Sequence, residues 1–127
     1  MTENRKPLVR AEPLALIAVG GFTGASLRYS VSLAFVGAFP WGTLAVNVLG
    51  SFLLGVVLYE RHLVDAVSAE TRLLVGTGFL SSFTTYSTFA LQTAQLDPSL
   101  AALNVVANYA LGLLAVLASR LVTRWVA

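Results

Sequence analysis

The chain has 127 residues, of which 57% are hydrophobic and only 11% are charged. Soluble domains usually carry about 25% charged residues, so this composition predicts an integral membrane protein with little soluble mass. The absence of cysteine excludes a disulfide framework and thiolate metal sites. The net charge of +2 comes mostly from the chain ends, which indicates basic membrane flanks rather than a nucleic-acid surface.

Long uncharged apolar runs predict an all-α integral membrane protein. Runs of about 18 or more such residues are typical of transmembrane helices. A single transmembrane domain is therefore expected over residues 1–127, without a soluble domain or a long linker. The expected spans are approximately residues 14–36, 41–59, 73–96 and 100–121.

The first span contains Gly20, Gly24 and Arg28 at steps of four, which puts them on one helix face. Two glycines at this spacing favour close helix packing. Apart from Arg120 at the end of the fourth span, Arg28 is the only charged residue within any expected span. Its side chain either extends to a membrane interface or faces a water-filled vestibule, where a fixed positive charge would attract anions.

The second span places Thr43, Asn47 and Ser51 on one face by the same spacing. Asn47 lies near the middle of the span, where an unpaired polar group is costly. Two interpretations stay open for it. Its side chain either bonds a neighbouring helix or offers an amide donor to a polar pathway.

The third span contains GTGFLSSFTTYSTF at residues 76–89, with six Ser/Thr residues and a tyrosine in the eight positions 81–88. Such hydroxyls can bond carbonyls one turn earlier and bend a helix, and Gly76 and Gly78 precede them. We therefore predict a break in this span. Freed carbonyls could coordinate a cation, and hydroxyls could donate to an anion. Tyr86 and Phe89 share a face, as ordinary core aromatics also do.

The fourth span carries Asn104, Asn108 and Gly112 on one face, with Tyr109 adjacent. The two asparagines either pair across helices or line a pathway. Ser99 is a candidate cap for the start of this helix.

The basic residues predict the orientation. With four spans, both termini and the middle loop share one side, which carries seven Lys/Arg residues, whereas the two short turns carry none. This bias predicts termini inside the cell. The seven are Arg5, Lys6, Arg10, Arg61, Arg72, Arg120 and Arg124.

The expected spans contain no Asp, Glu or His, so they lack the titratable side chains that proton coupling and most catalysis need. No nucleophile–base pair appears, so the chain is not expected to be an enzyme. A small proton-coupled multidrug exporter would need a carboxylate in span one, and Glu12 lies just before it. A non-transporting membrane accessory subunit is the other alternative.

Three segments resemble the Fluc (CrcB) family of fluoride ion channels. They are GGFTGASLRY (20–29), WGTLAVNVLGSFLLG (41–55) and GTGFLSSFTTYSTF (76–89). The resemblance implies passive export of cytoplasmic fluoride across the plasma membrane. It also implies an antiparallel dimer of four-helix subunits in the lipid bilayer, with two fluoride pathways.

The same resemblance assigns residues to this pathway. It implies that Asn47 is the pore asparagine, that Tyr86 and Phe89 occupy the two positions of an aromatic box, and that Tyr109 lies nearby. It also implies a polar track and a structural Na+ at the dimer centre. The track is formed by Thr43, Ser87 and Thr88, and the Na+ ligands are the backbone carbonyls of Ser81 and Thr84.

Two features depart from the family pattern. Tyr86 stands where the family has phenylalanine, and its hydroxyl adds a donor to the aromatic box. Ser81 and Ser82 stand where two glycines are common. In addition, members that insert in both orientations should have a weak charge bias. The strong bias here favours insertion in one direction, so the partner is either a second copy or an oppositely oriented paralogue.

Overall fold

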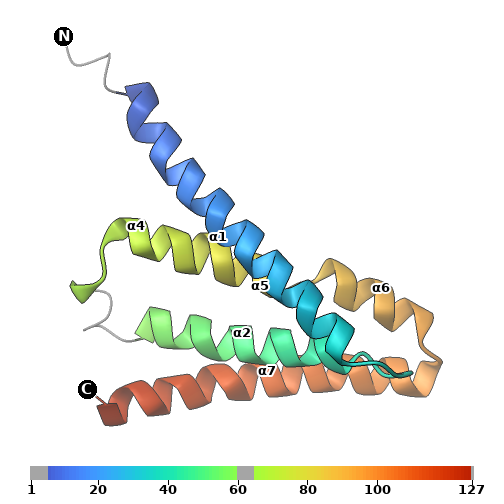
Figure 1. The fold of residues 1–127 in the computed structure, drawn as a ribbon. Helices are drawn as coiled ribbons and strands as arrows, with labels where there is room; N and C mark the ends of the chain where they lie inside the picture. The colour runs from blue at the N-terminus through green and yellow to red at the C-terminus, as the bar shows by residue number, and fades with distance from the viewer. Residues whose placement is uncertain (1–5, 60–64, 127) are drawn as a thin grey trace.

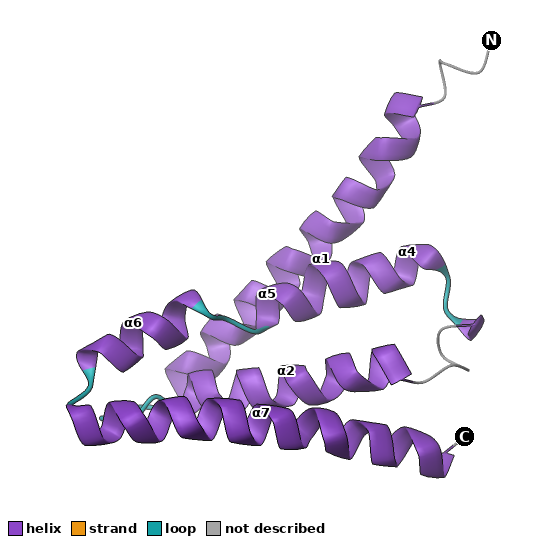
Figure 2. Ribbon diagram, turned by 180° about the vertical axis from the view of Figure 1, so that it is seen from behind, coloured by secondary structure: helices purple, strands orange, loops and turns teal. Residues whose placement is uncertain are grey.

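The computed structural model describes residues 6–59 and 65–126, and every regular element in these ranges is helical (Figures 1 and 2). Three of the helices are long. The elements are α1 Lys6–Ala34, α2 Trp41–Tyr59, α4 Ala69–Arg72, η2 Leu73–Leu80, α5 Ser81–Phe83, α6 Ser87–Gln95 and α7 Pro98–Val126.

Within the described residues, three helical segments are long and apolar enough to cross a membrane: Ala11–Ala34 in α1, the whole of α2, and the whole of α7. Their large apolar side chains are widely exposed, as at Phe22 and Leu114. Such a surface is unfavourable in water but suits lipid, since hydrocarbon solvates apolar side chains. The chain is therefore a helical membrane protein.

The predicted third span is interrupted, as the hydroxyl-rich segment indicated. After Ser68 caps α4, the chain forms the π-helix η2, the short helix α5, and a non-helical stretch at 84–86 before α6. The Ser81 hydroxyl donates to the Thr77 carbonyl, and Thr84 Oγ1 donates to the Leu80 carbonyl at 3.1 Å. These bonds compete with regular backbone pairing, which explains why the helix ends here.

Two helix starts differ from the prediction. The first helix begins at Lys6 and continues through Pro13, so Glu12 lies inside the apolar segment of α1 rather than before it. The fourth begins at Pro98, because the fixed φ of proline suits the first helical position. Ser99 is not the cap; its hydroxyl donates to the Asp97 carboxylate at 2.7 Å.

The helices pack as two main pairs, with α2 against α7 and α1 against η2 and α5 (Figures 1 and 2). The second pair meets through glycines, as the first span predicted. A Cβ on Gly20 would overlap the Leu74 carbonyl oxygen, and one on Gly24 would overlap that of Phe79. On the opposite side, a Cβ on Gly78 would lie 2.8 Å from the Ile17 carbonyl oxygen.

The start of α1, the end of α2, the start of α4 and the end of α7 lie at one end of the molecule (Figure 1). The count of basic residues assumed that these helix ends share one side, and they do. Which side faces the cell interior stays a prediction. Arg72 and Arg120 lie at this end, where the Arg120 guanidinium stands 5.9 Å from the centre of the Tyr59 ring. Arg5 and Arg61 lie outside the described residues.

Candidate functional site

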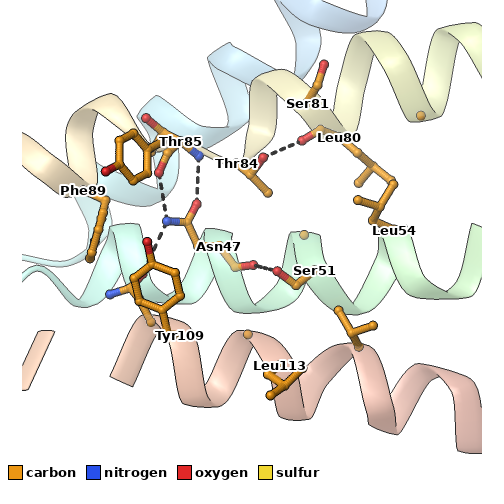
Figure 3. Close-up of a pocket in the computed structure, with 16 residues that line it drawn as sticks. Asn47, Ser51, Leu54, Leu80, Ser81, Thr84, Thr85, Phe89, Tyr109 and Leu113 are labelled. Carbon is orange, nitrogen blue, oxygen red and sulfur yellow. Dashed lines mark hydrogen bonds between the residues drawn. The ribbon is translucent and has the colours of Figure 1, made fainter. Parts of the chain in front are cut away.

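An open groove of about 610 Å³ runs between α2, α7 and the interrupted third span (Figure 3). Six of the residues assigned from the sequence line it together, although they come from separate elements. These six are Asn47, Ser81, Thr84, Tyr86, Phe89 and Tyr109.

Asn47 joins α2 to the break in the third span (Figure 3). Its Oδ1 accepts the Thr85 backbone N–H at 2.8 Å, and its Nδ2 donates to the Thr85 carbonyl at 2.9 Å. One carboxamide thus bonds both the backbone N–H and the backbone carbonyl of Thr85, which lies outside any helix. Backbone groups inside a membrane need such partners because lipid offers none. The Asn47 side chain therefore bonds a neighbouring segment, which was the first interpretation left open by the sequence. It also lines the groove, which is compatible with the second.

A chain of side-chain hydrogen bonds continues from Asn47 into α7 and α6. Asn47 Nδ2 donates to Asn108 Oδ1 at 3.4 Å, and Asn108 Nδ2 donates to Asn104 Oδ1 at 2.9 Å. Asn104 is fully buried and donates to Thr93 Oγ1, which in turn donates to the Phe89 carbonyl. The asparagines of spans two and four therefore pair across helices, and Asn47 and Asn108 also line the groove.

The break frees several carbonyls from regular helix bonding, among them those of Ser81 and Thr84. In a continuous α-helix, Thr85 N–H would bond the Ser81 carbonyl and Thr88 N–H would bond the Thr84 carbonyl. Instead, Thr85 N–H bonds Asn47, and Thr88 N–H bonds Thr85 Oγ1 at 3.2 Å. The Ser81 and Thr84 carbonyls are thus available to a cation, which prefers such oxygen ligands.

Three aromatic rings stand beside the break. The rings of Tyr86 and Phe89 are tilted at 48° with centroids 5.9 Å apart, and Phe89 meets Tyr109 edge to face at 6.2 Å. Phe89 is buried, whereas Tyr86 is 72% exposed and Tyr109 is 63% exposed. Ring edges carry the positive part of the aromatic quadrupole, so this cluster can present favourable edges to an anion.

The remaining assigned residues lie elsewhere. Thr43, Thr88 and Arg28 line a separate cavity of about 190 Å³ between α1, α2 and the break. Within the described residues, Arg28 donates to Thr88 Oγ1 at 3.4 Å, and its buried Nε has no partner. Ser87 is exposed and lines neither cavity; its hydroxyl lies 3.4 Å from Thr85 Oγ1.

Thr85 connects the two regions, because it lines both the groove and the Arg28 cavity. The sequence did not single it out among the hydroxyl residues around it, and only the position of Asn47 reveals its role. A third cavity of about 260 Å³ shares Ser32, Gly42 and Thr43 with the Arg28 cavity. The three cavities thus share lining residues between Thr85 and the turn that joins α1 to α2.

Known proteins resemble this chain over most of its length. The family model described as "CrcB-like protein, Camphor Resistance (CrcB)" matches residues 15–120. This match includes the groove residues, the break and both pairs of packed helices.

Curated relatives match most of the chain. A protein of Natronomonas pharaonis named "Fluoride-specific ion channel FluC 1" is 56% identical over 92% of this chain and 98% of its own length. A protein of the same name from Haloarcula marismortui is 54% identical over 93% of this chain and 91% of its own length. In Shewanella sp. strain ANA-3, "Fluoride-specific ion channel FluC" is 46% identical over 77% of this chain and 85% of its own length.

Proposed function

The chain belongs to the CrcB family, and we propose that it is a fluoride-specific ion channel that lets cytoplasmic fluoride leave the cell passively. The observation that carries this proposal is the break at 84–86, which Asn47 holds open beside a groove lined by Tyr86 and Phe89. The relatives named above are described as fluoride-specific ion channels, which are not enzymes.

The physical basis for export is the weak acidity of HF. Neutral HF crosses membranes and dissociates in the near-neutral cytoplasm, so the trapped anion needs a route out. An inside-negative potential drives it through a channel. Because fluoride holds its water tightly, the path must offer replacement donors such as the Asn47 amide, hydroxyls and aromatic edges.

The proposed pathway passes Asn47, Phe89, Tyr86 and Tyr109 in the groove. From there it crosses the break at Thr85 and enters the cavity that holds Arg28, Thr43 and Thr88. Arg28 serves as the vestibule charge that attracts the anion, since it lines this cavity together with Thr43 and Thr88. Ser87 stands beside Thr85 at the edge of this track.

We also propose a structural Na+ held by the Ser81 and Thr84 carbonyls of each subunit at a dimer centre. Support comes from the two backbone N–H groups that bond elsewhere and leave these carbonyls free. Carbonyl ligation depends on the backbone, so serine at positions 81 and 82 is compatible with it. When bound, the ion would neutralise carbonyl dipoles that converge where the helix is broken.

A dimer is proposed because the groove is open on one side and exposes Tyr86 and Tyr109 there. A partner packed antiparallel across this face would close the path and bring the second pair of carbonyls to the centre. Each subunit would cross the plasma membrane four times, with η2, α5 and α6 as the interrupted span. The partner is a second copy or, given the charge bias, an oppositely oriented paralogue.

The direct test is fluoride efflux from liposomes that contain the purified protein. We expect efflux far above that of empty vesicles, and little efflux of chloride. Asn47→Asp and Phe89→Ile should each reduce fluoride efflux strongly. No efflux from folded, correctly paired protein would refute the channel, and full efflux from both variants would favour the accessory-subunit alternative.

A further inference from the structure

The hydrogen bonds of Asn47 leave one of its two amide hydrogens loosely held. Oδ1 and the first Nδ2 hydrogen are both bound to the Thr85 backbone, at 2.8 and 2.9 Å. The second hydrogen is donated to Asn108 Oδ1 across 3.4 Å, the longest of the three contacts and hence the weakest. An anion can therefore take the second hydrogen without disturbing the break.

Asn108 can offer only an oxygen to Asn47. Its own Nδ2 donates to the backbone carbonyl of Asn104 at 2.8 Å and to Asn104 Oδ1 at 2.9 Å. Asn104 is 0% exposed, and its Nδ2 donates to Thr93 Oγ1 at 2.9 Å. In this series of hydrogen bonds, each side-chain amide donates to the next residue in the direction from Asn47 to Thr93. Asn108 therefore stays oriented with Oδ1 toward Asn47.

Both ends of the weak bond are reachable from the groove. Asn47 and Asn108 are half-buried and line the 610 Å³ cavity beside Tyr109 and Phe89, which Figure 3 shows around Asn47. An anion in the groove would compete with Asn108 Oδ1 for the same hydrogen. The neighbouring bonds to Thr85 would keep Asn47 in place during this exchange.

We propose that Asn108, oriented by Asn104, is a positioning residue of the ion path: its Oδ1 holds the second Asn47 hydrogen and yields it to fluoride. This inference rests on the proposed function, since it requires fluoride in the groove. When no anion is bound, the bond to Asn108 Oδ1 keeps the second Asn47 hydrogen from being left unpaired. It also weakens fluoride binding, and an ion that must leave quickly needs a weak site.

The first test removes the competing oxygen with Asn108→Leu, which is similar in size. Protein with ¹⁵N-labelled asparagine side chains in lipid nanodiscs is titrated with NaF against NaCl at constant ionic strength. We expect the fluoride concentration that half-saturates the shift of the Asn47 amide signal to fall about two- to tenfold, the effect of one net hydrogen bond. Fluoride current in planar bilayers is recorded on the same protein.

The second test uses Asn108→Asp, which strengthens the competing acceptor. At neutral pH the carboxylate should hold the Asn47 hydrogen more tightly and repel the anion, so the half-saturating fluoride concentration should rise. Lowering the pH protonates the carboxyl group, and the value should return toward that of the unchanged protein. Ser119→Ala is the matched control in α7, because among the described residues the buried Ser119 hydroxyl bonds the Val116 carbonyl alone.

The outcomes separate this inference from the proposed function. An unchanged half-saturating concentration in both Asn108 variants, with only the yield of folded protein reduced, would give Asn108 a purely structural role and overturn the inference. An Asn47 signal that does not respond to fluoride in the unchanged protein would overturn it as well. Absent current with a responsive Asn47 signal would instead contradict the channel function alone.

Discussion

Two helix contacts in this molecule both include closely approached glycines, but among the described residues only one of them also carries side-chain hydrogen bonds between its elements. Where α1 meets η2 and α5, the backbones approach closely at Gly20, Gly24 and Gly78. We call this contact the glycine seam. Where α2 meets α7 and the break, the contact depends on the hydrogen bonds of Asn47, Asn108 and Asn104, and we call it the polar seam.

Under the proposed function, the two contacts divide the positioning of the helices from the handling of the ion. Close backbone packing holds the glycine seam through shape, because lipid supplies little hydrophobic drive for helices to associate. Within the described residues, no side-chain hydrogen bond joins α1 to η2. The polar seam instead keeps donors and acceptors at the groove, where they can be exchanged with an ion.

The largest effect is expected from Gly24→Val in the glycine seam. A side chain here collides with the Phe79 backbone, which cannot move aside as a flexible side chain would. We expect a loss of about 3 kcal/mol in the free energy of unfolding, the upper range for overpacking. Thermal unfolding in detergent, followed by circular dichroism, measures it.

Gly76→Ala is the control for this change, because nothing lies within 4 Å of a Cβ at that position. Its stability should be equal to or slightly above that of the unchanged protein. Equal losses in both variants would mean that glycine matters here for flexibility and not for close approach.

A smaller loss is expected from Thr93→Val in the polar seam. The change keeps the shape but removes the acceptor of Asn104 Nδ2 and the donor to the Phe89 carbonyl. Hydrogen bonds between membrane helices contribute about 0.6 kcal/mol on average and up to about 1.7, so a loss of about 1–2 kcal/mol is expected in the same assay. Thr93→Ser keeps the hydroxyl and should unfold like the original; a similar loss in both would point to packing.

A still smaller change in stability is expected from Tyr86→Phe at the groove. The Tyr86 ring is 72% exposed, so removing its hydroxyl should alter the free energy of unfolding by less than about 0.5 kcal/mol. Fluoride current through the variant then measures the contribution of the hydroxyl alone. A clear loss of stability would show that the hydroxyl is bonded in the folded protein, for example across a dimer interface.

The smallest effect is expected at the turn before α7, outside both seams. The Ser99 hydroxyl donates to the exposed Asp97 carboxylate and lowers its pKa from the ordinary value of 3.8. A lowered folded-state pKa adds stability above the unfolded pKa, and this contribution disappears as the pH falls through the folded value. Ser99→Ala should move the pKa of Asp97 back toward 3.8 in an NMR titration, and an unmoved pKa would assign the shift to backbone donors.

Much of the fold could be read from hydropathy and hydroxyl content, because both act locally. The uncharged runs predicted the membrane helices, and the hydroxyl residues at 81–88 predicted the interruption between α5 and α6. Helix starts were less predictable. The first span was expected to start near residue 14, yet α1 begins at Lys6 and continues through Pro13, since a helix can lose one N–H and still be held by its neighbours.

The candidate site could be predicted only in part, for a reason visible at Thr85. Spacing alone placed Asn47 on a polar face and Asn104 and Asn108 on another. It could not indicate that Asn47 would bond the Thr85 backbone, since the two residues belong to different spans. It also did not separate Arg28, Thr43 and Thr88 from the groove, although they line a different cavity.

The sequence by itself therefore determined the membrane class, the family and the location of the helix break, all of which depend on residue type and local order. Only the tertiary structure decided that Asn47 bonds the Thr85 backbone, how Asn108 is oriented and that Thr85 lines two cavities. These depend on hydrogen bonds between residues up to 61 positions apart. Such bonds have direction as well as partners, and their direction is set only when the helices are packed.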